Sequence, residues 1–394
     1  MTDLVPLKRV AAINAGQSPP SEDVCDAGNG LPFLQGNAEF GAMHPIARYA
    51  CDAAPKRCRD GDILLSVRAP VGALNVADQP YGIGRGLCAI TPHKLVPRYL
   101  WWAMNASVPH LQSLATGSTY GAVAAEDVGG LMVRVPSLPE QQAVADYLDA
   151  DTARIDAVVR LRVQQRSRLD EREFALLSDV LVPGERRTSR LGFMASIHSG
   201  LTVDAQRDVG TDAVTRPYLR VANVHADALA LDSVSEITVP RSLAERCTLR
   251  FGDVLMTEGG DLDKLGRGTM WRDELPGALH QNHVFAVRPD PRVLRPEYLA
   301  LLTRSQHARS YFERTGSKTT GLASTSSEKI LGLPVPSLTV EEQMSLVQGA
   351  NEQLERMRYL QQTLNQQIEL LAERRQALIT AAVSGQLDIP GVAA

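Results

Sequence analysis

The sequence predicts an α+β protein in which two duplicated globular domains alternate with two long helices, and the helices pair as an antiparallel coiled coil with pseudo-twofold symmetry. Three observations predict this fold: an ordered internal repeat, two helical segments longer than a globular domain needs, and a single apolar stripe along each segment.

The length and composition favour several domains without a membrane segment. The chain has 394 residues, of which 44% are hydrophobic, enough for two or more cores. It has no run of about 18 apolar residues, and residues 1–9 lack the basic-then-apolar order of a signal peptide. We therefore expect a cytoplasmic protein with no membrane partner.

The cysteines do not suggest a disulfide framework or a zinc ribbon. They are odd in number, scattered, and never in a C-x-x-C pair: Cys25, Cys51, Cys58, Cys88 and Cys247. We expect them to be buried free thiols.

The charge does not by itself indicate a nucleic-acid partner. The formal net charge is −4, but the acidic excess lies in residues 139–186 and 339–394. The remaining two segments, 1–138 and 187–338, are neutral or slightly basic.

The internal repeat has a period of about 190–200 residues, which is longer than a solenoid period and therefore indicates a duplicated domain. In chain order the matched segments are 7–16 with 191–200, 32–37 with 217–222, 61–64 with 252–255, 99–100 with 298–299, 116–118 with 315–317, 135–138 with 335–338, and 140–141 with 342–343. Any single match is explained by a turn, because Gly-Asp and Pro-Ser are common turn pairs. The shared order indicates duplication.

Each copy divides into two parts. Residues 1–138 and 187–338 mix short β-branched runs with glycine and proline turns, as α+β domains do. Residues 139–186 and 339–394 contain the predicted long helices, each about 60–70 Å long at about 1.5 Å per residue.

The apolar stripes predict how these helices pair. In the second helix the stripe alternates spacings of four and three residues: Leu360, Leu364, Gln367, Leu371, Arg374, Leu378 and Ala381. A similar stripe in the first helix, interrupted by Arg162, Arg166 and Glu173, comprises Ile155, Val159, Leu169, Leu176 and Val180. The simplest partner for each helix is the helix of the other copy.

Four segments carry a resemblance to a known family. They are the helix entries P-S-L-P-E-Q-Q (136–142) and P-S-L-T-V-E-E-Q (336–343), the strand at 281–289, and the closing segment R-Q-A-L-I-T-A-A-V-S-G-Q-L-D (375–388). Together they resemble the specificity subunits of type I restriction-modification enzymes, over essentially the whole chain. The end of the first helix, residues 179–184, departs from the closing pattern of the second.

The resemblance implies a function and a set of partners. In that family each globular domain is a target recognition domain that reads one half of a split site in double-stranded DNA. The helices set the spacing and bind methylation subunits, two of them here, and restriction subunits can join. S-adenosylmethionine, ATP and Mg²⁺ are then expected on those partners, with no cofactor, metal or catalytic residue in this chain.

Candidate DNA-reading residues follow from the matched loops. Arginine suits guanine, asparagine and glutamine suit adenine, and glycine-bracketed polar loops suit phosphate. In the first domain the candidates are Gln35, Asn37, Arg68, Ser118, Thr119 and Tyr120. In the second they are Arg220, Asn223, Lys264, Arg267, Lys318, Thr319 and Thr320.

Catalytic interpretations find little support in the motifs. Residues 82–86 (G-I-G-R-G) precede an apolar strand, so a turn is favoured over a cofactor loop. His280 and His283 could suggest zinc, but no second cluster of ligands accompanies them. The sequence has neither an amino-methyltransferase N/D-P-P-Y motif nor a Walker A loop. Two alternatives stay open: a protein-binding coiled-coil scaffold without DNA, and, less favoured, a self-sufficient nuclease or methyltransferase.

Overall fold

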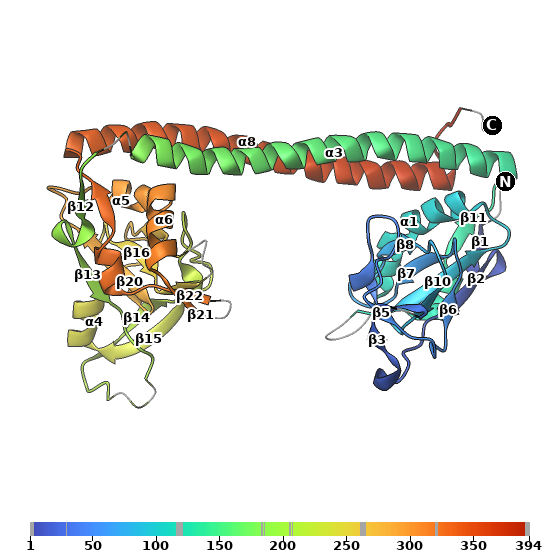
Figure 1. Ribbon diagram of the computed structural model, residues 1–394, viewed down its shortest axis with the longest axis horizontal. Helices are drawn as coiled ribbons and strands as arrows, with labels where there is room; N and C mark the ends of the chain where they lie inside the picture. The colour runs from blue at the N-terminus through green and yellow to red at the C-terminus, as the bar shows by residue number, and fades with distance from the viewer. Residues whose placement is uncertain are drawn as a thin grey trace. The chain divides into compact units, whose positions relative to one another are not determined.

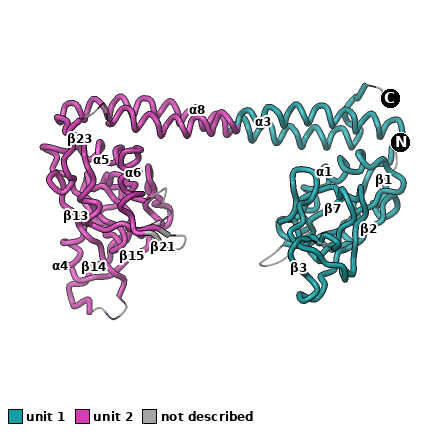
Figure 2. The backbone as a smooth tube through the Cα atoms, in the orientation of Figure 1, with its two compact units in different colours: residues 1–162, 366–394 teal, residues 163–365 magenta. Residues whose placement is uncertain are grey.

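The computed structural model describes residues 4–28, 30–115, 121–182, 184, 186–204, 206, 208–260, 265–319 and 322–390. The chain forms two compact units, which Figure 2 colours separately. Unit 1 comprises residues 1–162 and 366–394, and unit 2 comprises residues 163–365. Each unit therefore contains one globular domain and part of each long helix.

A four-stranded antiparallel sheet forms the centre of the unit 1 domain, in the order β2-β10-β7-β8 (Figure 1). Its strands are β2 (Ala11–Ala15), β10 (Leu87–Pro92), β7 (Ile63–Ser66) and β8 (Leu74–Val76). Side chains alternate across this sheet, as a strand's period of two requires. Leu65 and Ile90 pack with the helices, whereas Leu64 and Ala89 pack toward a second sheet.

The second sheet of unit 1 has five short strands, in the order β3-β5-β4-β9-β6. They are β3 (Cys25–Asp26), β5 (Tyr49–Ala50), β4 (Pro32–Leu34), β9 (Tyr81–Ile83) and β6 (Arg57–Cys58). Strands β4 and β9 are parallel, with Leu34 opposite Ile83. The domain is completed by α1 (Pro97–Leu114), α2 (Ala125–Gly130) and the pair β1 (Leu4–Pro6) with β11 (Met132–Arg134).

Unit 2 repeats this plan. The sheet β13-β20-β16-β18 has the strand order of the unit 1 centre, and its strands are β13 (Ala195–Ser199), β20 (Val284–Pro289), β16 (Val254–Thr257) and β18 (Gly268–Met270). The parallel pair recurs in the sheet of β15 (Ser235–Pro240), β14 (Ala213–Leu219) and β19 (Leu279–His280). The pair β12 (Thr188–Arg190) with β23 (Pro334–Pro336) corresponds to β1 with β11. The predicted duplication is confirmed by this shared topology.

Further elements complete unit 2. A small sheet holds β17 (Gly259–Gly260), β22 (Leu322–Ser324) and β21 (Ser317–Thr319). The helices are α4 (Arg241–Cys247), α5 (Pro296–Leu302), α6 (Gln306–Thr315) and α7 (Ser327–Leu331).

The two predicted long helices are α3 (Leu138–Leu181) and α8 (Val340–Ser384). In unit 1 the first part of α3 meets the last part of α8, where Arg375 Nε donates to Asp156 Oδ1 at 3.0 Å. In unit 2 the last part of α3 meets an earlier part of α8, where Gln361 Nε2 donates to Asp170 Oδ1 at 2.7 Å. The helices are therefore antiparallel, as predicted.

One part of the predicted stripe is wrong. Leu360 is 48% exposed, whereas Leu354 and Met357 are buried. Leu354 belongs to the core of the unit 2 domain together with Leu177 of α3. The helices therefore bury one face against their domain as well as one against each other. The predicted stripe took account only of the contact between the two helices.

A buried glutamine joins each long helix to its domain. Gln141 Oε1 accepts the N–H of Val96, which caps α1, at 2.7 Å. Gln343 Oε1 accepts the N–H of Arg295, which caps α5, at 2.8 Å. This role explains the glutamine that both entry motifs share, because its amide satisfies a helix-terminal N–H that burial would otherwise leave without a partner.

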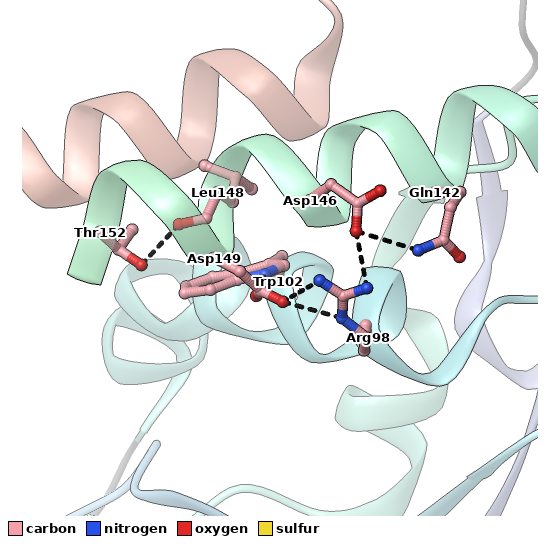
Figure 3. Close-up of polar contacts among 7 residues, drawn as sticks. All are labelled: Arg98, Trp102, Gln142, Asp146, Leu148, Asp149 and Thr152. Carbon is pink, nitrogen blue, oxygen red and sulfur yellow. Dashed lines mark hydrogen bonds and ion pairs between the residues drawn. The ribbon is translucent and has the colours of Figure 1, made fainter. Parts of the chain in front are cut away.

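Charged side chains add a second connection in unit 1, shown in Figure 3. Arg98 of α1 forms ion pairs with Asp146 and Asp149 of α3. Trp102 Nε1 donates to Asp149 Oδ1 at 2.8 Å. The domain is thus held on its helix by a buried hydrogen bond and by partly exposed charges.

Candidate nucleic-acid interface

Three predicted residues of the first domain lie together in one cleft. The cleft has a volume of about 850 Å³, and Gln35, Asn37 and Arg68 line it. Gln35 and Arg68 are exposed and Asn37 is half-buried. The structure therefore gathers two amide side chains and a guanidinium, which are the groups that read base edges.

The parallel pairing of β4 with β9 places two of the loops that line this cleft beside each other. Parallel strands end at the same edge, so the residues after Leu34 and after Ile83 lie side by side, and Gly84 N donates to Leu34 O at 2.8 Å. A Cβ on Gly16 would lie 2.1 Å from the Gly84 carbonyl oxygen. Only glycine permits so close a backbone crossing.

Arg68 lies in a loop after β7 that the domain holds in place. Ser66 Oγ donates to the carbonyl oxygens of Arg68 and Pro70 at 2.9 and 3.0 Å, and Val67 N donates to Gly86 O at 3.0 Å. The Arg68 side chain therefore projects from a fixed backbone.

Arg85 lines the same cleft and was missed by the sequence analysis. It lies within residues 82–86, where the predicted turn is confirmed by the bond from Leu87 N to Gly84 O at 3.0 Å. The signal was present, because an arginine flanked by glycines is typical of a presented side chain. The motif shows only the turn, however, and not the neighbouring segments that form the cleft.

The candidates of the second domain have different surroundings. Arg220 is exposed at the end of β14, the position that Gln35 occupies after β4. Asn223 is 5% exposed, and its Nδ2 donates to the carbonyl oxygens of Ala230 and Ser233 at 2.8 and 3.1 Å. Its Oδ1 accepts the Arg220 N–H at 2.8 Å. Asn223 therefore stabilises this loop, and its burial argues against the predicted contact with a base.

Asn223 also corrects the sequence alignment of the two loops. Its counterpart in the first domain is Glu39, which is 5% exposed and accepts the Gly36 N–H at 3.2 Å. Asn37, which the sequence matched with Ala222 immediately before Asn223, lines the cleft. One additional residue in the first loop shifts the register.

Of the other candidates in the second domain, the structure describes the surroundings of Arg267 alone, and Arg220 is not among its pocket neighbours. Arg267 lines a separate pocket beside α3, together with Glu173, Asp227 and Arg304. These carboxylates disfavour an approach by phosphate. Lys318 and Thr319 lie in β21, and their side chains are outside the described residues. Ser118, Thr119, Tyr120, Lys264 and Thr320 are also outside them.

The histidines and cysteines have structural surroundings. His280 is buried, with Nδ1 2.6 Å from the Val284 carbonyl oxygen, whereas His283 Nδ1 lies 2.5 Å from Glu258 Oε2. No cluster of three metal-ligating side chains occurs in the ranges that the structure describes.

All five cysteines are free, and four are buried as predicted. Burial raises the pKa of the Cys58 thiol to about 11 and that of Cys88 to about 12. Cys25 is exposed, contrary to the prediction, because strand β3 lies at the edge of its sheet.

Comparison with known proteins relates this architecture to one family. Residues 3–160 match the family described as the type I restriction modification DNA specificity domain. A protein of Methanocaldococcus jannaschii described as the MjaX specificity subunit of a type I restriction enzyme is 33% identical over 174 residues, covering 44% of this chain and 40% of that protein. The MjaIX specificity subunit of the same organism is 22% identical over 254 residues, covering 56% of this chain and 58% of that protein.

A solved structure extends the likeness in fold. A chain from a study of complex assembly and conformational transition of the type I R-M system superposes with a TM-score of 0.73. It is 18% identical, and the match covers 98% of both chains.

The fold thus defines a class: a duplicated α+β protein whose domains are held on paired long helices, and whose first domain matches the type I restriction modification DNA specificity domain. The sequence is similar to specificity subunits of type I restriction enzymes, residues 3–160 match the DNA specificity domain family, and the chain shares the fold of the solved structure over almost its whole length. The sequence matches span about two fifths and three fifths of the two curated relatives. Among the described residues, no helix is long and apolar enough to cross a membrane.

Proposed function

We propose that this chain reads a bipartite sequence in double-stranded DNA, one half with each globular domain, and holds methylation and restriction subunits on it. The observation that carries the proposal is the cleft of unit 1, where Gln35, Asn37 and Arg68 converge. These are the side-chain types that form paired hydrogen bonds with adenine and guanine. The counterpart position of Gln35 in unit 2 carries Arg220.

The chain itself is proposed to be non-catalytic. Two methylation subunits would supply S-adenosylmethionine binding and methyl transfer, and restriction subunits would supply ATP- and Mg²⁺-dependent cleavage in the cytoplasm. The long helices α3 and α8 are the proposed docking sites for these partners. A purified chain free of partners is therefore expected neither to methylate nor to cleave DNA.

Exchanging one domain tests the proposal. Residues 187–338 are replaced by the second domain of another family member, and the methylated sites are mapped across a genome. We expect one half of the site to change and the other half to persist. A scaffold that binds only proteins predicts an unchanged methylated sequence, and a change in both halves would contradict independent reading.

A further inference from the structure

One turn recurs at the same place in both domains. In unit 1 it joins β9 to β10, and Leu87 N donates to Gly84 O at 3.0 Å. In unit 2 it joins β19 to β20, and Val284 N donates to Gln281 O at 2.9 Å. The second residue of the turn is Arg85 in the first domain and Asn282 in the second.

Arg85 is presented by a backbone that cannot easily move. It is exposed, whereas the other residues of 81–90 are all buried. A Cβ on Gly84 would lie 3.1 Å from the Gln35 carbonyl oxygen, and one on Gly86 would lie 2.8 Å from it. The turn is therefore packed directly on the loop that carries Gln35, and the Arg85 side chain projects into the cleft from a fixed base.

The guanidinium of Arg85 is available to a ligand. Within the ranges that the structure describes, no residue forms an ion pair with it. The same cleft is lined by the amides of Gln35 and Asn37, which suit base edges, and by the charged side chains of Arg68 and Asp26. A carboxylate in the cleft disfavours a phosphate there more than it disfavours an uncharged base edge. A rigidly presented, unpaired guanidinium beside such amides favours the paired acceptors O6 and N7 of guanine over a single phosphate oxygen.

We propose that Arg85 selects a guanine in the half-site that the unit 1 domain reads. The inference rests on the proposed function, and it assigns one base contact to one turn. The counterpart Asn282 carries an amide at the same position, so guanine selection through this turn is a property of the first domain alone.

The test uses the chain assembled with its methylation subunits, with three variants. Methylation and binding are measured on a set of duplexes in which each position of the first half-site is changed in turn. The variants are Arg85→Ala, Arg85→Lys and, as a control, Arg59→Ala. Arg59 is an exposed arginine of the same domain outside the cleft.

We expect Arg85→Ala to reduce the preference for guanine at one position by roughly 10-fold to 100-fold, with preferences at the other positions kept. Arg85→Lys keeps the positive charge but loses the planar guanidinium with its paired N–H donors. It is therefore expected to lose much of this preference, with little change in binding to unrelated DNA. Arg59→Ala should behave as the unaltered chain does.

Two results would overturn the inference. One is a uniform loss of affinity for all duplexes, together with a slope of log affinity against log salt concentration that is smaller by about one. This combination marks a phosphate contact. The other is an unchanged preference in Arg85→Ala while Gln35→Ala or Arg68→Ala alters the half-site. This second result leaves the proposed function standing, whereas a domain exchange without effect on the methylated site refutes the function itself.

Discussion

The two globular domains share main-chain hydrogen bonds at corresponding turns and differ in the side chains that these turns present. Gly84 N donates to Leu34 O at 2.8 Å in the first domain, and Gln281 N donates to Leu219 O at 2.8 Å in the second. At these turns, however, Gly86 corresponds to His283. The comparison teaches that main-chain pairing sets the common scaffold of the two domains, which leaves the loop side chains free to differ.

The largest loss of stability is expected when the glutamine that joins each long helix to its domain is replaced. Gln141→Ala and Gln343→Ala each leave a buried helix-capping N–H without its acceptor, which costs about 2 kcal/mol of unfolding free energy. Because the contacts are equivalent, the two losses should be similar. Urea unfolding of the full chain measures them.

Gln142→Ala is the matched control, since Gln142 is exposed and its Nε2 donates to Asp146 at 3.1 Å on the surface. A loss for Gln141→Ala no greater than that for Gln142→Ala would show that the buried amide is not what joins the domain to its helix.

A smaller effect is expected in the pH dependence of stability, which should differ between the two domains. At the register position where the first domain has Ile83, the second has His280. Burial lowers the pKa of His280 below its ordinary value of 6.5, while the Val284 carbonyl and Asp253 oppose the shift and His198 adds to it. The folded pKa is below the unfolded one, so the unfolded state takes up the proton first as the pH falls. The stability that the protein gains by keeping His280 neutral is complete above about pH 6.5, and it is lost as the pH falls toward the folded pKa.

Urea midpoints of the unaltered chain and of His280→Leu, measured at several pH values between about 7.5 and 5.5, test this difference. The variant should have the flatter profile in the transition of unit 2. Identical pH profiles would show that His280 does not make the second domain acid-sensitive.

The smallest effect is expected at the charged connection of Figure 3. The side chains of Arg98, Asp146 and Asp149 are 41–58% exposed, so water and salt screen their attraction. Arg98→Ala should therefore cost well under the loss for Gln141→Ala, and high salt should reduce the difference from the unaltered chain. A loss as large as that of Gln141→Ala at high salt would instead assign the connection to Arg98.

The sequence predicted the features that depend on pattern and order. The repeat anticipated the common strand order, and the composition of 139–186 and 339–394 anticipated α3 and α8. The stripe through Leu360 failed because helix spacing does not show which face a third element covers.

The candidate site was predictable only in part, because it depends on contacts between distant segments. Gln35, Asn37 and Arg68 were found from matched loops, and the fold brings them into one cleft. Asn223 has the residue type of a base reader but is buried, because residues 230 and 233 fold back over it. Arg85 was overlooked because its exposure results from the crossing of three backbone segments.

Mapping methylated sites for two complementary variants tests the central claim most directly. The first combines Gln35→Ala, Asn37→Ala and Arg68→Ala in the unit 1 cleft, and the second is Arg220→Ala at the corresponding place in unit 2. The account predicts that the first variant relaxes one half of the methylated sequence and the second relaxes only the other half. Relaxation of the same half by both variants, or of both halves by either one, would contradict it.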